Sequence, residues 1–318
     1  MKKLFLLLVA AISCNLCALA QDNLVATLQH GSNIQAFYGE DALSTAHEAA
    51  ADGDVITLSA GEFNGLDMTK VITLRGEGTE RTHIKNHVTF TIPENSHHTL
   101  LLEGLNISTS SYQTVNIYGF SGSEKVVVSK CYFDVPGTNT PLAFEKCNAS
   151  VMQSHVIGAI CANNGSHVTC LNSVFSFPLC KGNGKFDIAN CYMNAGEGDF
   201  QYVHYSTIKN SIIHTRNPWL DITNSFSHCL TQGNIPVPVS DFGWVLSADG
   251  DVWNGIVEDN YHLSEEAAAT YIGTDGTQIG IYGGMYPYDL TPSYPLVKAL
   301  DVIGSHKNGK LIVKINVK

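Results

Sequence analysis

Residues 168–175 read Val168-Thr-Cys-Leu-Asn172-Ser-Val-Phe175, and residues 186–193 repeat the pattern as Phe186-Asp-Ile-Ala-Asn190-Cys-Tyr-Met193. The shared motif is apolar–x–apolar–x–Asn–Ser/Cys–x–apolar, and we call its Asn position the anchor. Two further copies run from Ser206 to Ile213 and from Leu220 to Ser227. Looser copies have another residue at the anchor, namely Gly104, Lys130 and Gln153. A motif that recurs at about this period is the signature of a solenoid.

The apolar positions change phase at the anchor. In the first copy Val168 and Cys170 precede Asn172 with a period of two, and Ser173 and Phe175 follow it with the same period. A single strand cannot shift its phase, because its side chains alternate strictly. A one-residue bend between two strands can, and Asn or Gly tolerates the left-handed conformation of such a bend. We therefore predict left-handed or near-bridge torsions, with side chains aligned in a ladder, at Asn172, Asn190 and Asn210.

The spacing of the anchors predicts the fold class. Anchors at 104, 130, 153, 172, 190 and 210 are 26, 23, 19, 18 and 20 residues apart. This is about one coil of a parallel β-helix, in which coils stack at about 4.8 Å. The step to Asn224 is only 14 residues, short for a coil. An antiparallel β-sandwich is the alternative, but the two-residue hairpin turns expected of it are missing. We predict an all-β, right-handed, single-stranded parallel β-helix.

Both ends of the solenoid need covering, because the end of a stack leaves apolar surface and strand edges open. A short helix is predicted over residues 41–50, with Asp41 as its cap and Leu43, Ala46 and Ala50 on one face. At the other end the run Lys310 to Val317 alternates as a final strand. The predicted organisation is a signal peptide (1–20), an N-terminal strand and capping helix (21–54), β-helix coils (55–265) and a C-terminal capping segment (266–318).

Two runs resemble a known superfamily. The first run begins with Ala42-Leu and continues as Ala49-Ala-Ala-Asp-Gly-Asp-Val-Ile-Thr-Leu-Ser-Ala-Gly-Glu-Phe63. It is similar to the N-terminal part of secreted bacterial right-handed β-helix proteins of the pectin-lyase-like superfamily. The second run begins with Tyr261-His-Leu and continues as Gly273-Thr-Asp-Gly-Thr-Gln-Ile-Gly-Ile-Tyr-Gly-Gly284, and it resembles the closing segment of the same group. The resemblance implies a β-helix. It does not single out an activity, because that superfamily contains lyases, hydrolases, adhesins and uncharacterised surface proteins.

The first residues predict export. Lys2 and Lys3 precede an apolar run, and Ala18-Leu-Ala20 before Gln21 matches signal-peptide cleavage. A retained membrane anchor is the alternative, but the apolar run is short. No other segment of the sequence is apolar enough to span a bilayer. We expect a secreted protein located in the periplasm, at the cell surface or outside the cell.

The charge of the chain excludes one class of partner. Without Lys2 and Lys3, 16 basic residues stand against 29 acidic ones, which gives a net charge of −13. A nucleic-acid partner would need a basic surface, so none is expected. A polyanionic sugar is disfavoured for the same reason. We expect a polysaccharide or other glycan as the partner, and the oligomeric state is open.

Seven cysteines follow the signal peptide, so they cannot all form pairs. Cys131 and Cys191 occupy the position after the anchor, which other copies fill with serine. This predicts a stack of small side chains inside the coils rather than a disulfide framework. No Cys or His pair has the spacing of a zinc site, and neither a metal nor a cofactor is expected. The serines at this position are Ser154, Ser173, Ser211 and Ser225.

Chemistry on a filled β-helix must come from outward strand positions and loops. Asp187 and Asp221 share an outward column two repeats apart, which places them roughly 9–10 Å from each other. This is near the upper limit for the carboxyl groups of an inverting glycosidase. Lys209 lies between them. The catalytic hypothesis is that Asp187 and Asp221 are the general acid and general base of a hydrolase, with Lys209 beside them. The alternative is a solvated face on which Asp and Lys offset each other, and Lys209 would lower both pKa values.

A second outward column follows the anchors and carries aromatic and polar side chains. Such residues hold sugars by ring stacking and hydrogen bonds, although aromatics on this face are also ordinary surface packing. The predicted carbohydrate-binding residues are Tyr132, Asp134, Tyr192, His214, Arg216, Trp219 and His228.

The catalytic signatures of the pectin-cleaving relatives are missing. The sequence has no Asn-Thr-Asp or Gly-His-Gly motif, and Asp249-Gly-Asp251 is too sparse for a calcium loop. We therefore expect a secreted protein that binds extracellular carbohydrate or acts as a cell-surface scaffold without catalysis. The alternative is a glycoside hydrolase or polysaccharide lyase that acts on a complex polysaccharide.

Overall fold

The computed structural model describes most of the chain. The described residues are 24–94, 96–108, 115–122, 124–135, 140–194, 203–214, 223–231, 239–240, 257, 259–294, 297–302 and 313–317. The predicted signal peptide, residues 1–20, lies outside them. Among the described residues, no helix has the length and apolar character needed to cross a membrane.

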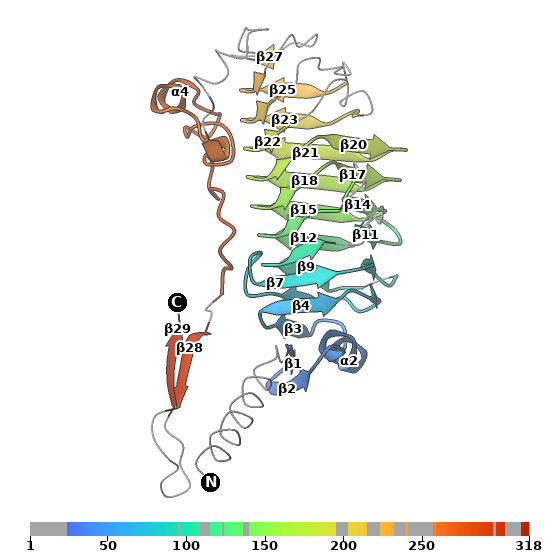
Figure 1. Cartoon of the computed structure of the whole chain (residues 1–318). Coiled ribbons are helices and arrows are strands. Elements are labelled where there is room, and N and C mark those ends of the chain that lie inside the picture. The colour runs from blue at the N-terminus through green and yellow to red at the C-terminus, as the bar shows by residue number, and fades with distance from the viewer. Residues whose placement is uncertain are drawn as a thin grey trace, which may run out of the picture.

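The chain forms a parallel β-solenoid of about seven turns with three parallel sheets, which confirms the predicted fold class (Figure 1). Along residues 55–181 each coil contributes one strand to each sheet in turn, and the described strands between Lys185 and Thr231 belong to only two of the sheets.

The twelve-stranded sheet consists, in spatial order, of β2 (Asn33–Tyr38), β1 (Val25–His30), β3 (Val55–Leu58), β6 (Thr73–Arg75), β9 (Thr99–Glu103), β12 (Lys125–Ser129), β15 (Asn148–Met152), β18 (His167–Leu171), β21 (Lys185–Ala189), β23 (Thr207–Lys209), β25 (Ser225–Ser227) and β27 (Val239–Ser240). The nine-stranded sheet consists of β4 (Gly61–Asn64), β7 (Thr82–Lys85), β10 (Asn106–Ser108), β13 (Tyr132–Phe133), β16 (His155–Val156), β19 (Val174–Phe175), β22 (Tyr192–Met193), β24 (Ile212–Ile213) and β26 (Leu230–Thr231). The six-stranded sheet consists of β5 (Asp67–Met68), β8 (Thr89–Thr91), β11 (Val115–Tyr118), β14 (Leu142–Glu145), β17 (Ile160–Asn163) and β20 (Pro178–Lys181).

The anchors form the bend between the twelve-stranded and the nine-stranded sheet. Asn172, Asn190 and Asn210 have φ values of 47°, 53° and 50°, so the predicted left-handed torsions are confirmed. Lys130 and Gln153 adopt the same conformation, with φ values of 54° and 46°. This conformation is unfavourable by roughly 1–2 kcal/mol for a residue with a Cβ atom, and Asn tolerates it best. The repeated Asn is therefore explained by the bend.

The register predicted for the last copy of the motif is wrong. Thr207 and Ile208 pair with Ser225 and Phe226, so the next anchor is His228, whose φ is 51°. This anchor lies 18 residues after Asn210, a regular coil. Asn224 has a different role. Its Oδ1 accepts from the Ser206 N–H at 3.0 Å, and its Nδ2 donates to the Val203 carbonyl at 2.7 Å. Asn224 is therefore a buried residue whose hydrogen bonds fix the start of a coil, and it does not form the bend.

The stack of small side chains after the anchor is confirmed for Cys131 and Cys191, both fully buried. The serine hydroxyls in the stack join adjacent coils. Ser154 Oγ accepts from the Cys131 N–H at 3.2 Å, and Ser211 Oγ accepts from the Cys191 N–H at 3.1 Å. Ser225 was assigned to the stack wrongly, and Cys229 takes that place. All seven cysteines among the described residues are buried and free.

The N-terminal end is covered by an antiparallel hairpin and a helix. Strand β1 pairs with β2 on one side and with β3 on the other, antiparallel in both cases. Helix α2 (Ala42–Ala49) buries Leu43 and Ala46 as predicted. Asp41 is at the N-cap position, but its side chain makes no capping hydrogen bond, so that part of the prediction is wrong. Burial of the apolar face holds this short helix in place.

The C-terminal part runs along the side of the solenoid, back towards the N-terminal coils (Figure 1). We call residues 259–294 the strap. It begins with a 3₁₀ turn, η1 (Asp259–Tyr261), and helix α4 (Glu265–Thr270). Beyond it, β28 (Val297–Val302) and β29 (Val313–Val317) form an antiparallel hairpin. Strand β29 lies within the predicted final strand, whose residues 310–312 are outside the described part of the chain.

The strap is bonded to the solenoid along the line of anchors. The Asn172 amide donates to the carbonyls of Ile281 and Gly283, and the Gln153 amide donates to that of Pro287. Lys130 donates to the Thr291 carbonyl at 2.5 Å. The Asn side chains were expected to align with one another, but the hydrogen bonds of Asn172 and Asn210 are directed at the strap. The strap partners of Asn210 are the side chains of Thr274 and Asp275 and the backbone of Thr274 and Gly280.

Candidate functional site

The outer face of the twelve-stranded sheet carries a regular grid of side chains. Register places Thr169 beside Asp187, and Asp187 beside Thr207. Two residues further along the same strands, Leu171, Ala189 and Lys209 form a parallel row. Because strand side chains alternate, both rows point away from the filled core.

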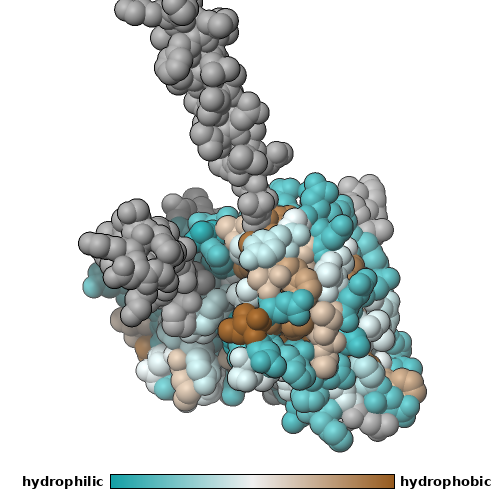
Figure 2. Space-filling model, turned by 90° about the horizontal axis from the view of Figure 1, so that it is seen from below, coloured by the Kyte–Doolittle hydropathy of each residue, from teal (hydrophilic) through white to brown (hydrophobic). Residues whose placement is uncertain are grey.

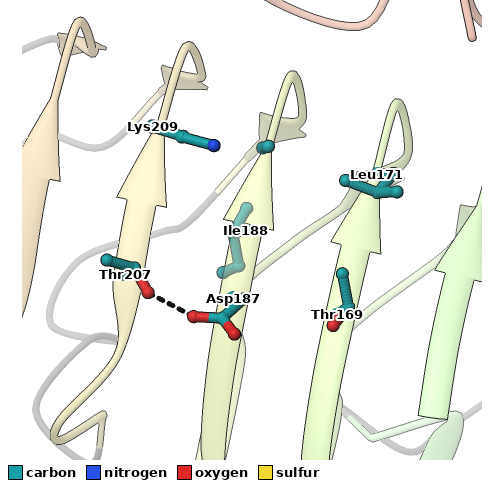
Figure 3. Close-up of a pocket in the computed structure, with 7 residues that line it drawn as sticks. Thr169, Leu171, Asp187, Ile188, Thr207 and Lys209 are labelled. Atoms are coloured by element: carbon teal, nitrogen blue, oxygen red, sulfur yellow. Dashed lines mark hydrogen bonds between the residues drawn. The ribbon is translucent and has the colours of Figure 1, made fainter. Parts of the chain in front are cut away.

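These two rows line an open pocket of about 290 Å³ (Figure 3). Leu171 and Ala189 supply an apolar part, and the hydroxyl groups of Thr169 and Thr207 supply a polar part. Figure 3 shows the exposed Lys209 side chain reaching towards the strand that carries Asp187. Lys209 forms no ion pair with any residue that the structure describes.

Asp187 is held by neighbours on both sides. His167 Nε2 lies 2.6 Å from Asp187 Oδ2, and the Thr207 hydroxyl donates to Asp187 Oδ1. Partial burial acts to raise the pKa of Asp187. The hydrogen bonds from Thr207 and His167, with the charges of His167 and Lys185, outweigh it and hold the pKa below 3.8. Asp187 is therefore an ionised carboxylate at neutral pH.

A second pocket of about 260 Å³ adjoins the first on the same sheet. Thr169 lines both pockets, and His167, the partner of Asp187, lines the second. The remaining polar lining includes Lys125 and Asn148. The two pockets together form a band across the strands from β9 to β23.

The structure brings together two of the three residues predicted for catalysis. Asp187 and Lys209 both line the first pocket. The column predicted to hold both Asp187 and Asp221 is wrong, because the position two repeats from Asp187 is occupied by Ser225. Asp221 itself lies outside the described residues. Asp187 is the only carboxylate among the described residues that line this pocket.

The residues predicted for carbohydrate binding do not form one exposed column. Tyr192 is only 5 % exposed, because the strap covers it and its ring lies 4.6 Å from that of Tyr261. Its hydroxyl group is 3.2 Å from His214 Nδ1. Tyr132 is half-buried, and Asp134 lies two residues beyond it on the same edge.

Three other predicted residues have different outcomes. His228 was assigned to the outward column wrongly, since it is an anchor and its Nδ1 lies 2.9 Å from Ser227 Oγ. Arg216 and Trp219 lie outside the described residues.

Sequence reasoning missed His167 and the aromatic residues of the strap. His167 could have been found, because it lies two residues before Thr169 on the same outward face. The strap tyrosines gather beside Tyr132: burial, with the nearby Tyr261, Tyr282 and Tyr132, raises the pKa of Tyr288 well above 10. No periodic signal in the strap indicated this contact.

The chain was also compared with known proteins. No family model, no curated protein and no solved structure matched it. The candidate site is thus defined by the geometry of its own residues.

Proposed function

We propose that this protein binds an extracellular carbohydrate on the outer face of its twelve-stranded sheet and does not cleave it. The observation that carries the proposal is the pocket of Thr169, Asp187, Thr207 and Lys209, in which an ionised carboxylate and a cation flank an apolar surface. The expected leader, residues 1–20, supports an extracellular or periplasmic ligand. The runs within 42–63 and 261–284 support membership in the pectin-lyase-like superfamily as part of the same proposal.

The pocket offers the groups that a sugar ring requires. Sugar-binding sites pair apolar contact with a few placed hydrogen-bonding groups. Leu171 and Ala189 can contact the C–H groups of the ring. Asp187 uses one acceptor position on each oxygen for His167 and Thr207, and a carboxylate has about four such positions. The remaining positions can accept from sugar hydroxyls, and Lys209 can donate to a ring or hydroxyl oxygen.

The same geometry favours binding over hydrolysis. An inverting glycosidase needs a protonated carboxylic acid and a second carboxylate about 6.5–9.5 Å away. Asp187 is held in its charged form, so it is a poor general acid at neutral pH. Within the described lining of the pocket no second carboxylate stands opposite it.

The test is a glycan array screened with the purified protein, followed by calorimetric titration of each hit. Asp187→Asn and Lys209→Ala should weaken binding by about 10- to 100-fold, as expected for hydrogen bonds to charged groups. Lys181→Ala is the matched control, because Lys181 is exposed on β20 of another sheet. Reducing-end and unsaturated-product assays on the same hits should show no turnover.

Two results would overturn the proposal. One is that the wild type cleaves a hit and that the Asp187→Asn protein, although it is folded, does not. The other is glycan binding that both pocket variants leave unchanged.

A further inference from the structure

At the N-terminal side of the solenoid, one strand edge has no strand partner among the described residues. Strand β2 is the last strand of the twelve-stranded sheet, and within the part of the chain that the structure describes β1 is its only neighbour there. Its sequence, Asn33-Ile-Gln-Ala-Phe-Tyr38, contains no charged residue and no proline. Ile34 is 71 % exposed and Tyr38 is 70 % exposed. Figure 2, which views the molecule from this end, shows apolar residues lying among hydrophilic ones.

The free hydrogen-bonding groups of β2 belong to alternate residues. The Gly39 N–H donates to the Leu24 carbonyl, so Gly39 is on the side of β2 that faces β1. In an antiparallel pair such residues alternate with residues whose N–H and C=O point the other way. By this alternation Phe37 and Gln35 are bonded towards β1. Ile34, Ala36 and Tyr38 therefore direct their N–H and C=O groups outwards.

The side chains of the same three residues share one face of the strand. Positions two apart in a strand point to the same side, so Ile34, Ala36 and Tyr38 lie together. All three are exposed. The outward backbone groups and the apolar side chains thus belong to one set of residues.

We propose that β2 pairs with β2 of a second copy of this chain, antiparallel, about a two-fold axis at Ala36. In this register Ile34 lies opposite the Tyr38 of the other copy, and Ala36 lies opposite itself. The outward N–H and C=O groups of all three residues then find partners. Aromatic and β-branched side chains that face each other across strands stabilise such a pair.

A second copy fits this edge for two reasons. The strand is complementary to itself, which a two-fold interface requires. The chain has a net charge of −11, but β2 has none, so two copies can approach here without placing like charges opposite each other. Sheets with free edges usually carry lysine, proline or a bulge that prevents pairing. The uninterrupted register of β2 with β1 shows no bulge.

The first test is the oligomeric state of the purified protein, measured by sedimentation across a wide concentration range. The wild type should form a reversible dimer, because one strand pair is small compared with the about 1,200–2,000 Å² of stable interfaces. Ile34→Lys should weaken the dimer at least about tenfold, because it places a charge opposite Tyr38 of the other copy. Gln35→Lys is the matched control: it adds the same charge on the opposite face and should leave the dimer intact.

The second test fixes the register. In a hydrogen-bonded antiparallel pair the two Ala36 Cα atoms would be about 5.5 Å apart, within reach of a disulfide bond or a short thiol crosslinker. Ala36→Cys should give a covalent dimer, whereas Ser44→Cys, on helix α2, should not. The native cysteines of the described residues are buried and should not compete.

The proposal is overturned if the wild type is monomeric at all concentrations, which would leave the edge to another partner. It is also overturned if Ile34→Lys dimerises like the wild type, or if Ala36→Cys remains uncrosslinked. Circular dichroism and thermal unfolding confirm that each variant folds, so that loss of the dimer is not loss of structure. None of these outcomes depends on carbohydrate binding.

Discussion

The side-chain amide of Asn172 donates to the carbonyl oxygens of Ile281 and Gly283, which lie 109 and 111 residues further along the chain. Asn172 therefore does two things at once. Its backbone makes the left-handed bend of a coil, and its side chain holds the strap. Asn210 combines the same two roles, and Gln153 and Lys130 do so with longer side chains.

Asn172→Gly should be less harmful than Asn172→Val. Glycine keeps the bend but removes two hydrogen bonds, which costs roughly 1–3 kcal/mol of unfolding free energy. Valine loses the same bonds and adds roughly 1–2 kcal/mol of strain in the left-handed region. Urea denaturation measures the free energy of unfolding of both variants. Lys146→Gly is the control, since Lys146 has a φ of 50° on a different bend, and glycine there should be neutral or slightly stabilising. Equal stability of the two Asn172 variants would contradict the role of Asn172 in the bend, and an Asn172→Gly protein as stable as the wild type would contradict its role in holding the strap.

Cys191 should tolerate serine and reject leucine. Serine occupies the equivalent position in the neighbouring coils, where it bonds backbone groups of the adjacent coil. Cys191→Ser should therefore be mild, whereas Cys191→Leu should overpack the coil and cost about 1–3 kcal/mol.

The reactivity of the native thiols provides an independent check on this burial. Burial raises the pKa of Cys191 to about 12, so a thiol reagent should label it only after unfolding. Rapid labelling of Cys131 or Cys191 in the folded protein would show that this stack is misplaced.

The contribution of Asp187 to stability should depend on pH. Its folded-state pKa is below its unfolded value of 3.8, so the contribution is present above 3.8 and is lost as the pH falls through the lowered pKa. The carboxylate is about half exposed, so solvent screening limits the effect to below about 1 kcal/mol. Asp187→Asn should be less stable than the wild type at neutral pH, and the difference should vanish under strongly acidic conditions. A difference that stays constant down to acid pH would contradict the charged pairing.

The attachment of strap residues 285–294 to the solenoid should depend on Glu103. This buried carboxylate accepts from Arg75 Nε at 3.3 Å and from the Ser293 N–H at 3.1 Å. Glu103→Ala leaves both donors without this partner, so residues 285–294 should exchange amide hydrogens faster and be cut sooner by protease. The expected local cost is about 1–3 kcal/mol.

Glu62→Ala is the control for Glu103→Ala. Glu62 forms an exposed pair with Lys85, which is worth about 0–1 kcal/mol. If hydrogen exchange in the strap is the same in both variants, Glu103 does not hold the strap.

The coils could be predicted because two simple rules act at the same place. Side-chain alternation fixes which residues enter the core, and the left-handed bend selects Asn at 172, 190 and 210. The prediction went wrong at Asn224, where the same residue type is used for its hydrogen bonds. A sequence motif does not distinguish an Asn chosen for its torsion from one chosen for its amide.

The candidate site was predictable in part for the same reason. The column containing Asp187 and Lys209 followed from alternation. The placement of Asp221 in that column failed, because the predicted register of the last coil was wrong. The strap could not be predicted, because its contacts join single side chains of the coils to the backbone and side chains of an irregular segment. Such contacts leave no period in the sequence. Tyr192 was therefore expected on an open face, but it lies beneath Tyr261.

The length of the strap is also matched to the number of coils in the solenoid. Its contacts advance from Ile281 at Asn172 to Pro287 at Gln153 and Thr291 at Lys130, so each coil is matched by a few residues of strap. Repeat proteins commonly gain or lose whole repeats, because each repeat contacts only its neighbours. Here an inserted coil would displace every later contact unless the strap grew with it. The number of coils is thereby tied to the length of a segment that belongs to none of them.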